Sequence, residues 1–344
     1  SGNANTCNAN GVAIAEQMSE LLGQALHISP SDVVVASTGV IGQPLDIAPI
    51  AAGIPELVKC LGPHSDEAAE GIMTTDTRRK EIAVSFTAGG KECRIGGICK
   101  GSGMIHPNMA TMLVYVTTDA KADPADLQKM LSAAVDKSFN MCTVDGDTST
   151  NDTMILLANG ASGVEVKTEE DKAALVGLIE HICIKTEEDK KAMADLVLAI
   201  CTDMARRVAS DGEGATHLIE VEAYGLPTEH DARLVAKAIA GSTLFKAAVF
   251  GRDANWGRIM AAAGYSGADV DPTKADCIIK SSAGEVQVMK DGFGADFSEE
   301  LAKKVLTEHD ITVIVRFYQG DGEAKAWGCD LTYDYVKING DYRT

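Results

Sequence analysis

The sequence predicts a mixed α+β fold with a second, smaller α/β lobe. Stretches with the 3.6-residue apolar period of helices alternate with β-branched runs that are typical of strands. Some of these strands meet in short glycine turns, as in antiparallel hairpins, whereas others are separated by whole helices. The length of 344 residues, 45% of them hydrophobic, suffices for a large core and favours two cooperating lobes.

The first third of the chain predicts helices beside a hairpin. Residues 12–26 have helical spacing, and residues 31–42 contain a β-branched run that predicts a short strand before a glycine-punctuated loop. Residues 44–60 predict helical pieces broken by prolines. The segment 82–103 predicts a hairpin that turns at its Ala-Gly-Gly sequence.

The middle of the chain alternates strand and helix. Residues 111–120 predict a buried strand, 122–140 an amphipathic helix with acidic residues in its first turn, and 153–159 a further strand. A helical region follows, in which the KTEEDK sequence that starts at Lys167 is repeated from Lys185. Two copies are too few for a solenoid, so we expect a local duplication in a surface helical hairpin.

The last third predicts a second alternation of strands and helices. Strands are expected at 216–225, 243–251, 276–280, 285–289 and 311–318, and helices at 227–241 and 255–264. Residues 312–331 predict a closing hairpin across a Gly-Asp-Gly turn. The second lobe is placed at about residues 226–335, after a weak boundary at Gly225-Leu226-Pro227.

Composition excludes several classes of function. The chain carries 31 Lys and Arg against 50 Asp and Glu, a formal net charge of −19. Nucleic acids and anionic membranes attract basic surfaces, so neither is an expected partner. The nine cysteines form no C-x-x-C pair and no metal-ligand spacing, which predicts no metal site and reduced thiols in the cytoplasm. Neither a membrane span nor a signal peptide is expected from the apolar pattern.

The sequence KGSGMIHPNMATML, which starts at Lys100, predicts a self-activating nucleophile. A polar, glycine-rich loop runs directly into a hydrophobic strand that begins with Thr111. Attack of the Thr111 hydroxyl on the Ala110 carbonyl, followed by hydrolysis, would make Thr111 a new N-terminus. An α-amino group has an ordinary pKa of about 7.7–8.0, so it can act as the base for its own hydroxyl. The alternative is a simple glycine loop before a strand whose first residue is a β-favoured threonine.

Together with further motifs, this sequence resembles the ArgJ family of ornithine acetyltransferases, the glutamate N-acetyltransferases of arginine biosynthesis. The motifs follow one another along the whole chain: SGNAN at the start, ASTGVIG at 36–42, MTTDT at 73–77, DGEGATHLIEV at 211–221, GRDANWGRI at 251–259 and NGDYRT at the end. The resemblance implies that the α+β fold is a layered mixed α/β sandwich of the ArgJ/DmpA-like type, with a second, smaller α/β lobe.

The resemblance also implies a two-chain enzyme, cut between Ala110 and Thr111 into an α-chain of residues 1–110 and a β-chain of residues 111–344. It implies acetyl transfer from N-acetyl-L-ornithine to L-glutamate through an acetylated Thr111, with no cofactor. Bifunctional members of the family also use acetyl-CoA as a co-substrate, and both kinds of activity stay open here. The implied assembly is a heterotetramer of two α- and two β-chains, with small amino acids as the substrates.

Further residues match the site motifs of the family. Thr38 and Gly39 match the pair assigned to the oxyanion hole, which acyl transfer requires because its tetrahedral intermediates carry a negative oxygen. The substrate contacts match Thr74, Lys100, Thr111, Glu213, Asn339 and Thr344. A lysine suits a substrate carboxylate and a glutamate suits an ammonium group, while Asn and Thr add directional hydrogen bonds. The choice between Thr74 and its neighbours Thr75 and Thr77 stays open.

Two other functions stay open. An N-terminal-nucleophile amidase or aminopeptidase of the same fold would resolve the acyl-enzyme with water instead of glutamate. A non-catalytic amino-acid-binding relative would remain a single chain. The acidic loop at 145–148 resembles a phosphatase nucleophile motif or an EF-hand, but its chain context fits neither, so we interpret it as a polar loop that shapes the pocket.

Overall fold

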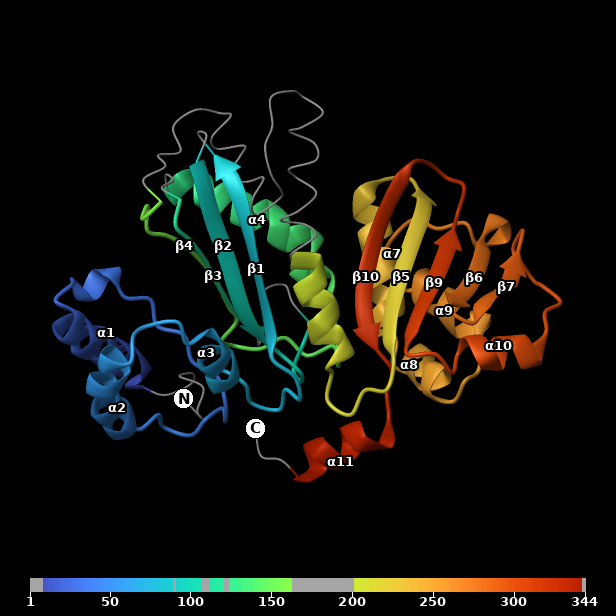
Figure 1. The fold of residues 1–344 in the computed structure, drawn as a ribbon. Coiled ribbons are helices and arrows are strands. Elements are labelled where there is room, and N and C mark those ends of the chain that lie inside the picture. The colour runs from blue at the N-terminus through green and yellow to red at the C-terminus, as the bar shows by residue number, and fades with distance from the viewer. Residues whose placement is uncertain (1–8, 89–90, 107–111, 121–123, 163–200, 342–344) are drawn as a thin grey trace.

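Two mixed β-sheets lie side by side in the computed structural model, and helices pack against both of them (Figure 1). The structure describes residues 9–88, 91–106, 112–120, 124–162 and 201–341. The helix over residues 201–210, here called the central helix, lies between the two sheets (Figure 1). The predicted α+β class is therefore confirmed. The duplicated KTEEDK sequence lies outside the described residues.

The N-terminal part of the protein is helical. Helix α1 (Gly11–Leu26) matches the predicted helix, and α2 (Ile47–Lys59) runs continuously through Pro55, where a break was predicted. Helix α3 (Ser65–Gly71) follows. The strand predicted within residues 31–42 is wrong, because residues 33–38 form no strand after the short 3-10 helix η1 (Pro30–Asp32). Val34 is 60% exposed, and a β-branched run becomes a strand only where it fits a half-buried sheet surface.

The first sheet has four strands in the order β1-β2-β3-β4. Its strands are β1 (Lys80–Ala88), β2 (Lys91–Lys100), β3 (Leu113–Thr118) and β4 (Thr153–Ala158). The predicted hairpin is confirmed, since β1 and β2 pair antiparallel. Strands β3 and β4 pair parallel, and such a pair needs a crossover, which α4 (Pro124–Lys137) and the 3-10 helix η2 (Phe139–Met141) provide.

Because of the register of this sheet, four strand ends lie next to one another at one edge. Lys80 pairs with Cys99, Lys100 with Leu113, and Leu113 with Thr153. The start of β1, the end of β2 and the starts of β3 and β4 therefore lie together, at the lower end of the sheet in Figure 1. Met112, at the end of the glycine-rich sequence, lies directly before β3 at this edge.

The second sheet has the order β10-β5-β9-β6-β7-β8. Its strands are β5 (Leu218–Leu226), β6 (Asp276–Ser281), β7 (Gly284–Lys290), β8 (Phe293–Gly294), β9 (Asp310–Arg316) and β10 (Gly322–Cys329). The predicted closing hairpin is wrong, because β5 lies between β9 and β10. Gln319 N donates to Gly225 O at 2.7 Å, so the connection between β9 and β10 passes over the end of β5. This sheet also starts before the predicted lobe boundary.

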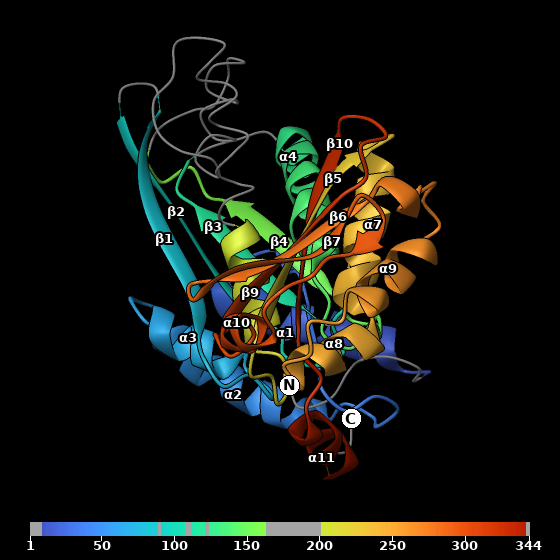
Figure 2. The ribbon, with the colours of Figure 1, turned by 90° about the vertical axis from the view of Figure 1, so that its right-hand side faces the viewer.

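Helices cover one face of the second sheet, as Figure 2 shows for α7 and α9. The helices in this part of the chain are α7 (Glu229–Gly241), α8 (Thr243–Phe250), α9 (Trp256–Gly264) and α10 (Glu299–Val305), with the 3-10 helix η3 (Pro272–Lys274) and the C-terminal α11 (Tyr333–Asp341), which lies below the sheets in Figure 1. The strand predicted at 243–251 is wrong, because these residues form α8. Ser242 caps α8 by accepting a hydrogen bond from Phe245 N, and a short apolar run does not separate strand from buried helix by its period alone.

One hydrophobic core runs through both halves of the protein. Buried side chains of the first sheet, such as Val114, belong to the same cluster as those of the second sheet, such as Val221. The central helix joins the two. Its Met204 is 1% exposed and lies against Gly97 of β2, while its Arg206 pairs with Glu220 of β5. Among the described residues, no helix is both long and apolar enough to cross a membrane.

Candidate functional site

A pocket of about 200 Å³ opens where the collected strand ends of the first sheet meet α11. Six residues predicted from the sequence line it: Thr38, Gly39, Thr74, Lys100, Glu213 and Asn339. The remaining lining residues are Ile41, Thr75, Gly103, Met104, Asp145, Asp147, Ser149 and Tyr335. The other predicted site residues, Ala110, Thr111 and Thr344, lie outside the described residues.

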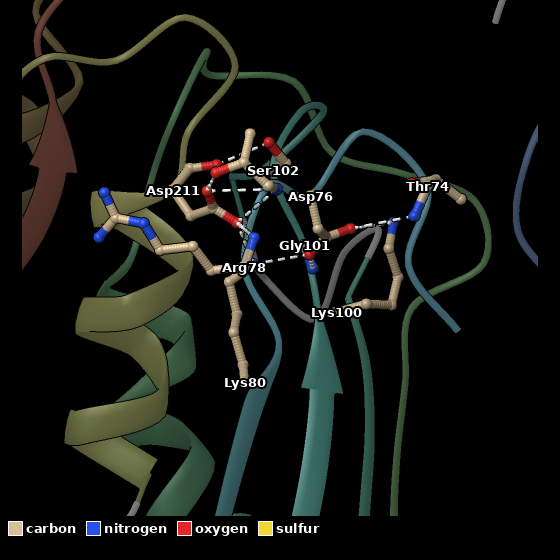
Figure 3. Close-up of polar contacts among 9 residues, drawn as sticks. Thr74, Asp76, Arg78, Lys80, Lys100, Gly101, Ser102 and Asp211 are labelled. Carbon is tan, nitrogen blue, oxygen red and sulfur yellow. Dashed lines mark hydrogen bonds and ion pairs between the residues drawn. The ribbon is translucent and has the colours of Figure 1, made fainter. Parts of the chain in front are cut away.

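A buried charge network underlies this pocket (Figure 3). Lys80 Nζ lies 2.7 Å from Asp76 Oδ1 and 2.6 Å from Asp211 Oδ2, and the three side chains are 1%, 0% and 5% exposed. A buried charge is stable only when it is paired and hydrogen-bonded. Asp76 follows α3, Lys80 begins β1 and Asp211 follows the central helix. The network therefore joins the segment that leads into β1 to the segment that follows the central helix, 131 positions away.

Asp76 positions two segments of the pocket wall. Its carboxylate accepts hydrogen bonds from Gly101 N at 2.7 Å and from Thr74 N at 3.2 Å, and Lys100 Nζ lies 3.9 Å from its Oδ2 (Figure 3). Burial would raise the pKa of Asp76, but Lys80 and Lys100 lower this pKa below its ordinary value. The carboxylate therefore stays ionised at neutral pH and keeps its hydrogen bonds.

Asp211 positions the acidic side of the pocket. Its carboxylate accepts hydrogen bonds from the backbone N–H and the hydroxyl of Thr77, and its carbonyl accepts one from Ser102 Oγ at 2.6 Å. Glu213 N in turn donates to Ser102 O at 3.0 Å. A Cβ at Gly103 would lie 2.4 Å from Glu213 Cδ, so only glycine leaves room for that carboxylate. Thr77 is held by the network, while Thr74 and Thr75 line the pocket.

The pocket wall carries opposite charges. Lys100 is 2% exposed, and burial lowers its pKa, although Asp76 opposes this shift. Glu213 is 7% exposed and accepts a hydrogen bond from Asn339 Nδ2 at 2.8 Å. A cation, an anion and an amide around one small cavity suit a substrate that has both a carboxylate and an ammonium group.

The segment before α2 supplies donors to the same cavity. Thr38 is buried, and Gly39 has a φ of 131°, a conformation that favours glycine. A threonine hydroxyl and a backbone N–H are donor types that stabilise a developing oxyanion. The chemistry that this pocket supports is therefore acyl transfer between compounds of amino-acid size.

Asp145 and Tyr335 also line the pocket, and no individual role was predicted for either of them. Asp145 accepts hydrogen bonds from Met104 N at 2.6 Å and Ile105 N at 2.9 Å, so it holds the glycine-rich loop in place. The Tyr335 hydroxyl donates to Asp145 Oδ2 at 3.4 Å. The acidic loop thus shapes the pocket, as predicted. Across the described ranges, no group of three metal-ligating side chains gathers that could hold an ion.

Comparison with known proteins gives consistent matches. Residues 1–344 match the ArgJ family. The chain is 48% identical to the arginine biosynthesis bifunctional protein ArgJ of Caldanaerobacter subterraneus subsp. tengcongensis, over 100% of this chain and 82% of that protein. It is 44% identical to the glutamate N-acetyltransferase of Methanocaldococcus jannaschii, over 100% of this chain and 83% of that protein. The crystal structure of the bifunctional protein argJ from Bacillus halodurans is similar with a TM-score of 0.56 and 41% identity, covering 66% of this chain and 98% of that chain.

Replacement of the central cation is predicted to destabilise the protein. Lys80→Met leaves Asp76 and Asp211 buried without their partner, and breaking such a pair costs about 3–5 kcal/mol. Lys304→Met is the control, because the exposed pair of Lys304 with Glu300 contributes at most about 1 kcal/mol. Urea unfolding monitored by circular dichroism measures the free energy of unfolding of both variants. Equal stability of the two variants would contradict the role given to the network.

Proposed function

The chain belongs to the ArgJ family, and from this premise we propose that it transfers an acetyl group from N-acetyl-L-ornithine to L-glutamate. It is a glutamate N-acetyltransferase of arginine biosynthesis. The observation that carries the proposal is the pocket, where the buried Lys100 and Glu213 present opposite charges beside Thr38 and Gly39. Its volume of about 200 Å³ suits an amino acid, since sites for drug-sized ligands measure about 300–1,000 Å³.

Thr111 is the proposed nucleophile. Its carbonyl carbon is bonded to Met112, which precedes β3 at the edge where Lys100 pairs with Leu113. In the first half-reaction, the Thr111 Oγ attacks the acetyl carbonyl and its proton moves to the α-amino group of Thr111. The acetyl C–N bond then breaks, ornithine leaves with that proton, and the acetyl group stays on the threonine as an ester.

In the second half-reaction, the neutral amine of glutamate attacks this ester. The ester C–O bond breaks, the Thr111 oxygen takes back a proton through the α-amino group, and N-acetyl-L-glutamate leaves. Both half-reactions pass through a tetrahedral intermediate with a negative oxygen. The Thr38 hydroxyl and the Gly39 N–H are the proposed donors to it, and one such donor contributes about 2.7–4 kcal/mol.

The charges of the pocket assign the ends of the substrate. Lys100 is proposed to bind the α-carboxylate, which N-acetyl-L-ornithine and glutamate share, and Glu213 the side-chain ammonium of ornithine. Thr74 and Asn339 line the same cavity and add hydrogen bonds. Thr344 is proposed as a further contact on the family resemblance alone.

Other properties of the family enter this proposal as expectations. The two chains on either side of the cut are expected to associate as a heterotetramer of two α- and two β-chains in the cytoplasm. The chemistry described above uses no cofactor. Acetyl-CoA is a second donor only if the protein is bifunctional, and an assay with acetyl-CoA and glutamate tests that directly.

A transfer assay tests the proposed function. The purified protein is incubated with N-acetyl-L-ornithine, with and without glutamate, and both N-acetyl-L-glutamate and free acetate are measured. We expect N-acetyl-L-glutamate to form in proportion to the ornithine released, with little acetate. Release of acetate at the same rate with and without glutamate would instead identify an amidase.

Replacement of the nucleophile is predicted to abolish two reactions at once. Thr111→Ala removes the hydroxyl that both cuts the chain and carries the acetyl group. The intact mass under denaturing conditions should stay at 36.1 kDa, and transfer should be lost. Thr307→Ala, which removes an exposed hydroxyl after α10 that does not line the pocket, is the control and should be cut and active. A cut or active Thr111→Ala protein would refute the assignment.

Replacement of the buried pocket lysine is predicted to weaken catalysis. Lys100→Met keeps an unbranched side chain of similar length but removes its charge. Because a hydrogen bond to a charged group contributes about 1.5–3 kcal/mol, kcat/KM should fall about 10- to 100-fold. Lys274→Met, at a side chain that is 68% exposed, is the control. Steady-state kinetics with N-acetyl-L-ornithine measures both. An unchanged kcat/KM in Lys100→Met would exclude a contact with the substrate.

A further inference from the structure

Asp152 lies directly before β4. It is hydrogen-bonded to Met112, the residue directly before β3. Its Oδ1 accepts a hydrogen bond from Met112 N at 2.7 Å, while Thr153 N donates to Met112 O at 2.9 Å. Both backbone polar groups of Met112 are therefore held, one by the Asp152 side chain and one by the next residue. The proposed mechanism gives Asp152 no role.

The second oxygen of this carboxylate is unusual. Asp152 Oδ2 is buried and, within the part of the chain that the structure describes, accepts no hydrogen bond. A buried acceptor without a donor costs free energy and is rare in native proteins. Burial raises the pKa of Asp152 to about 7, although the Met112 N–H and Lys100 both lower it. Asp152 Oδ2 can therefore accept a hydrogen bond from a donor group that forms during the reaction.

Covalent geometry identifies a donor. Three bonds join the nitrogen of Met112 to the α-nitrogen of Thr111, so the two nitrogens lie within about 4 Å of each other. A carboxylate that binds the first nitrogen through Oδ1 is thereby within reach of the second through Oδ2. After the chain is cut before Thr111, that second nitrogen is a free amine with hydrogen-bond donors of its own.

We propose that Asp152 is a positioning residue for the nucleophile, with Oδ1 fixed on the Met112 N–H and Oδ2 accepting a hydrogen bond from the new α-amino group of Thr111. The inference rests on the proposed function, because only a cut chain has this amine. During acetyl transfer the amine takes the hydroxyl proton, becomes an ammonium group, and passes the proton to the departing amine. The Asp152 carboxylate stabilises the ammonium group, and the ammonium group in turn lowers the pKa of Asp152.

The charge of Asp152 also sets the strength of the base. A carboxylate beside an amine favours the protonated form and raises the pKa of that amine. Among the described residues, the charged side chain that acts on Asp152 is Lys100, at the end of β2, and its charge has the opposite effect on the amine. Removal of the carboxylate alone should therefore lower the pKa of the Thr111 amine and leave it without an orienting partner.

Asp152→Asn tests this inference in the full-length protein. The amide oxygen of asparagine can still accept from Met112 N, whereas its NH₂ group, in the place of Oδ2, cannot accept from the amine. The chain should be cut as in the wild type. Per free N-terminal Thr111, kcat should fall about 10²-fold, as for a misplaced catalytic group. The acidic limb of the kcat/KM profile should move to lower pH, because the amine loses the carboxylate that raised its pKa.

Two further variants sharpen the test. Asp119→Asn is the matched control, because Asp119 Oδ1 accepts from Arg94 N at the same distance of 2.7 Å beyond the other end of β3. It should leave kcat and the pH profile unchanged. Asp152→Glu restores a carboxylate and should return the acidic limb to its wild-type position, even if kcat stays reduced.

Three results would overturn the inference. One is a wild-type kcat and pH profile in Asp152→Asn, and another is an acidic limb in Asp152→Glu that stays where Asp152→Asn has it. The third is a folded but uncut Asp152→Asn protein, since Asp152 would then act before the amine exists. Failure of the proposed function looks different, because in that case the wild-type protein transfers no acetyl group to glutamate.

Discussion

The pairing of one buried lysine with two aspartates is the interaction on which the rest of the site depends. Lys80 holds Asp76 and Asp211 at hydrogen-bond distance, and each carboxylate then places a different wall of the pocket. Asp76 fixes the backbone at Thr74 and Gly101. Buried ion pairs contribute little net stability compared with apolar packing, so we assign this network mainly to positioning.

The same network explains how an acidic protein can present a cation to its substrate. Asp76 lies 2.7 Å from Lys80 but 3.9 Å from Lys100, so its negative charge is committed chiefly to Lys80. Asp76 opposes the lowering of the Lys100 pKa by burial, but this pair is too long for a hydrogen bond. The N–H groups of Lys100 can therefore serve a substrate carboxylate. Glu213, placed through Ser102, supplies the opposite charge across the cavity.

The sequence predicted residues that line the pocket, but it did not predict the buried charge network that holds their segments together. Each short motif occupies one loop, so Thr38, Lys100 and Glu213 could be assigned from local sequence, and the structure places them in one pocket. The pairing of Lys80 with Asp211 was missed, because the two residues are 131 positions apart, Lys80 belongs to no motif, and Asp211 was given no role within its DGEGAT motif. The only local signal was the four-residue spacing of Asp76 and Lys80, which is common on protein surfaces.

The fold shows the same limit. Local patterns predicted α1, the β1-β2 hairpin and α4, whose contacts lie close in sequence. They failed where a distant partner decides the structure. β5 inserts between β9 and β10, although a glycine turn joins the latter two, and the apolar run of α8 is helical because it covers a sheet. Short apolar runs do not reveal which surface will bury them.

The central claim is that this pocket carries out acetyl transfer through Thr111. The most direct measurement is peptide mass spectrometry of the protein after brief incubation with N-acetyl-L-ornithine, before and after addition of glutamate. The account predicts one acetyl group on the peptide that begins with Thr111, and its loss when glutamate is added. An unmodified Thr111 peptide during active turnover, or an acetyl group on another residue that glutamate removes, would contradict it.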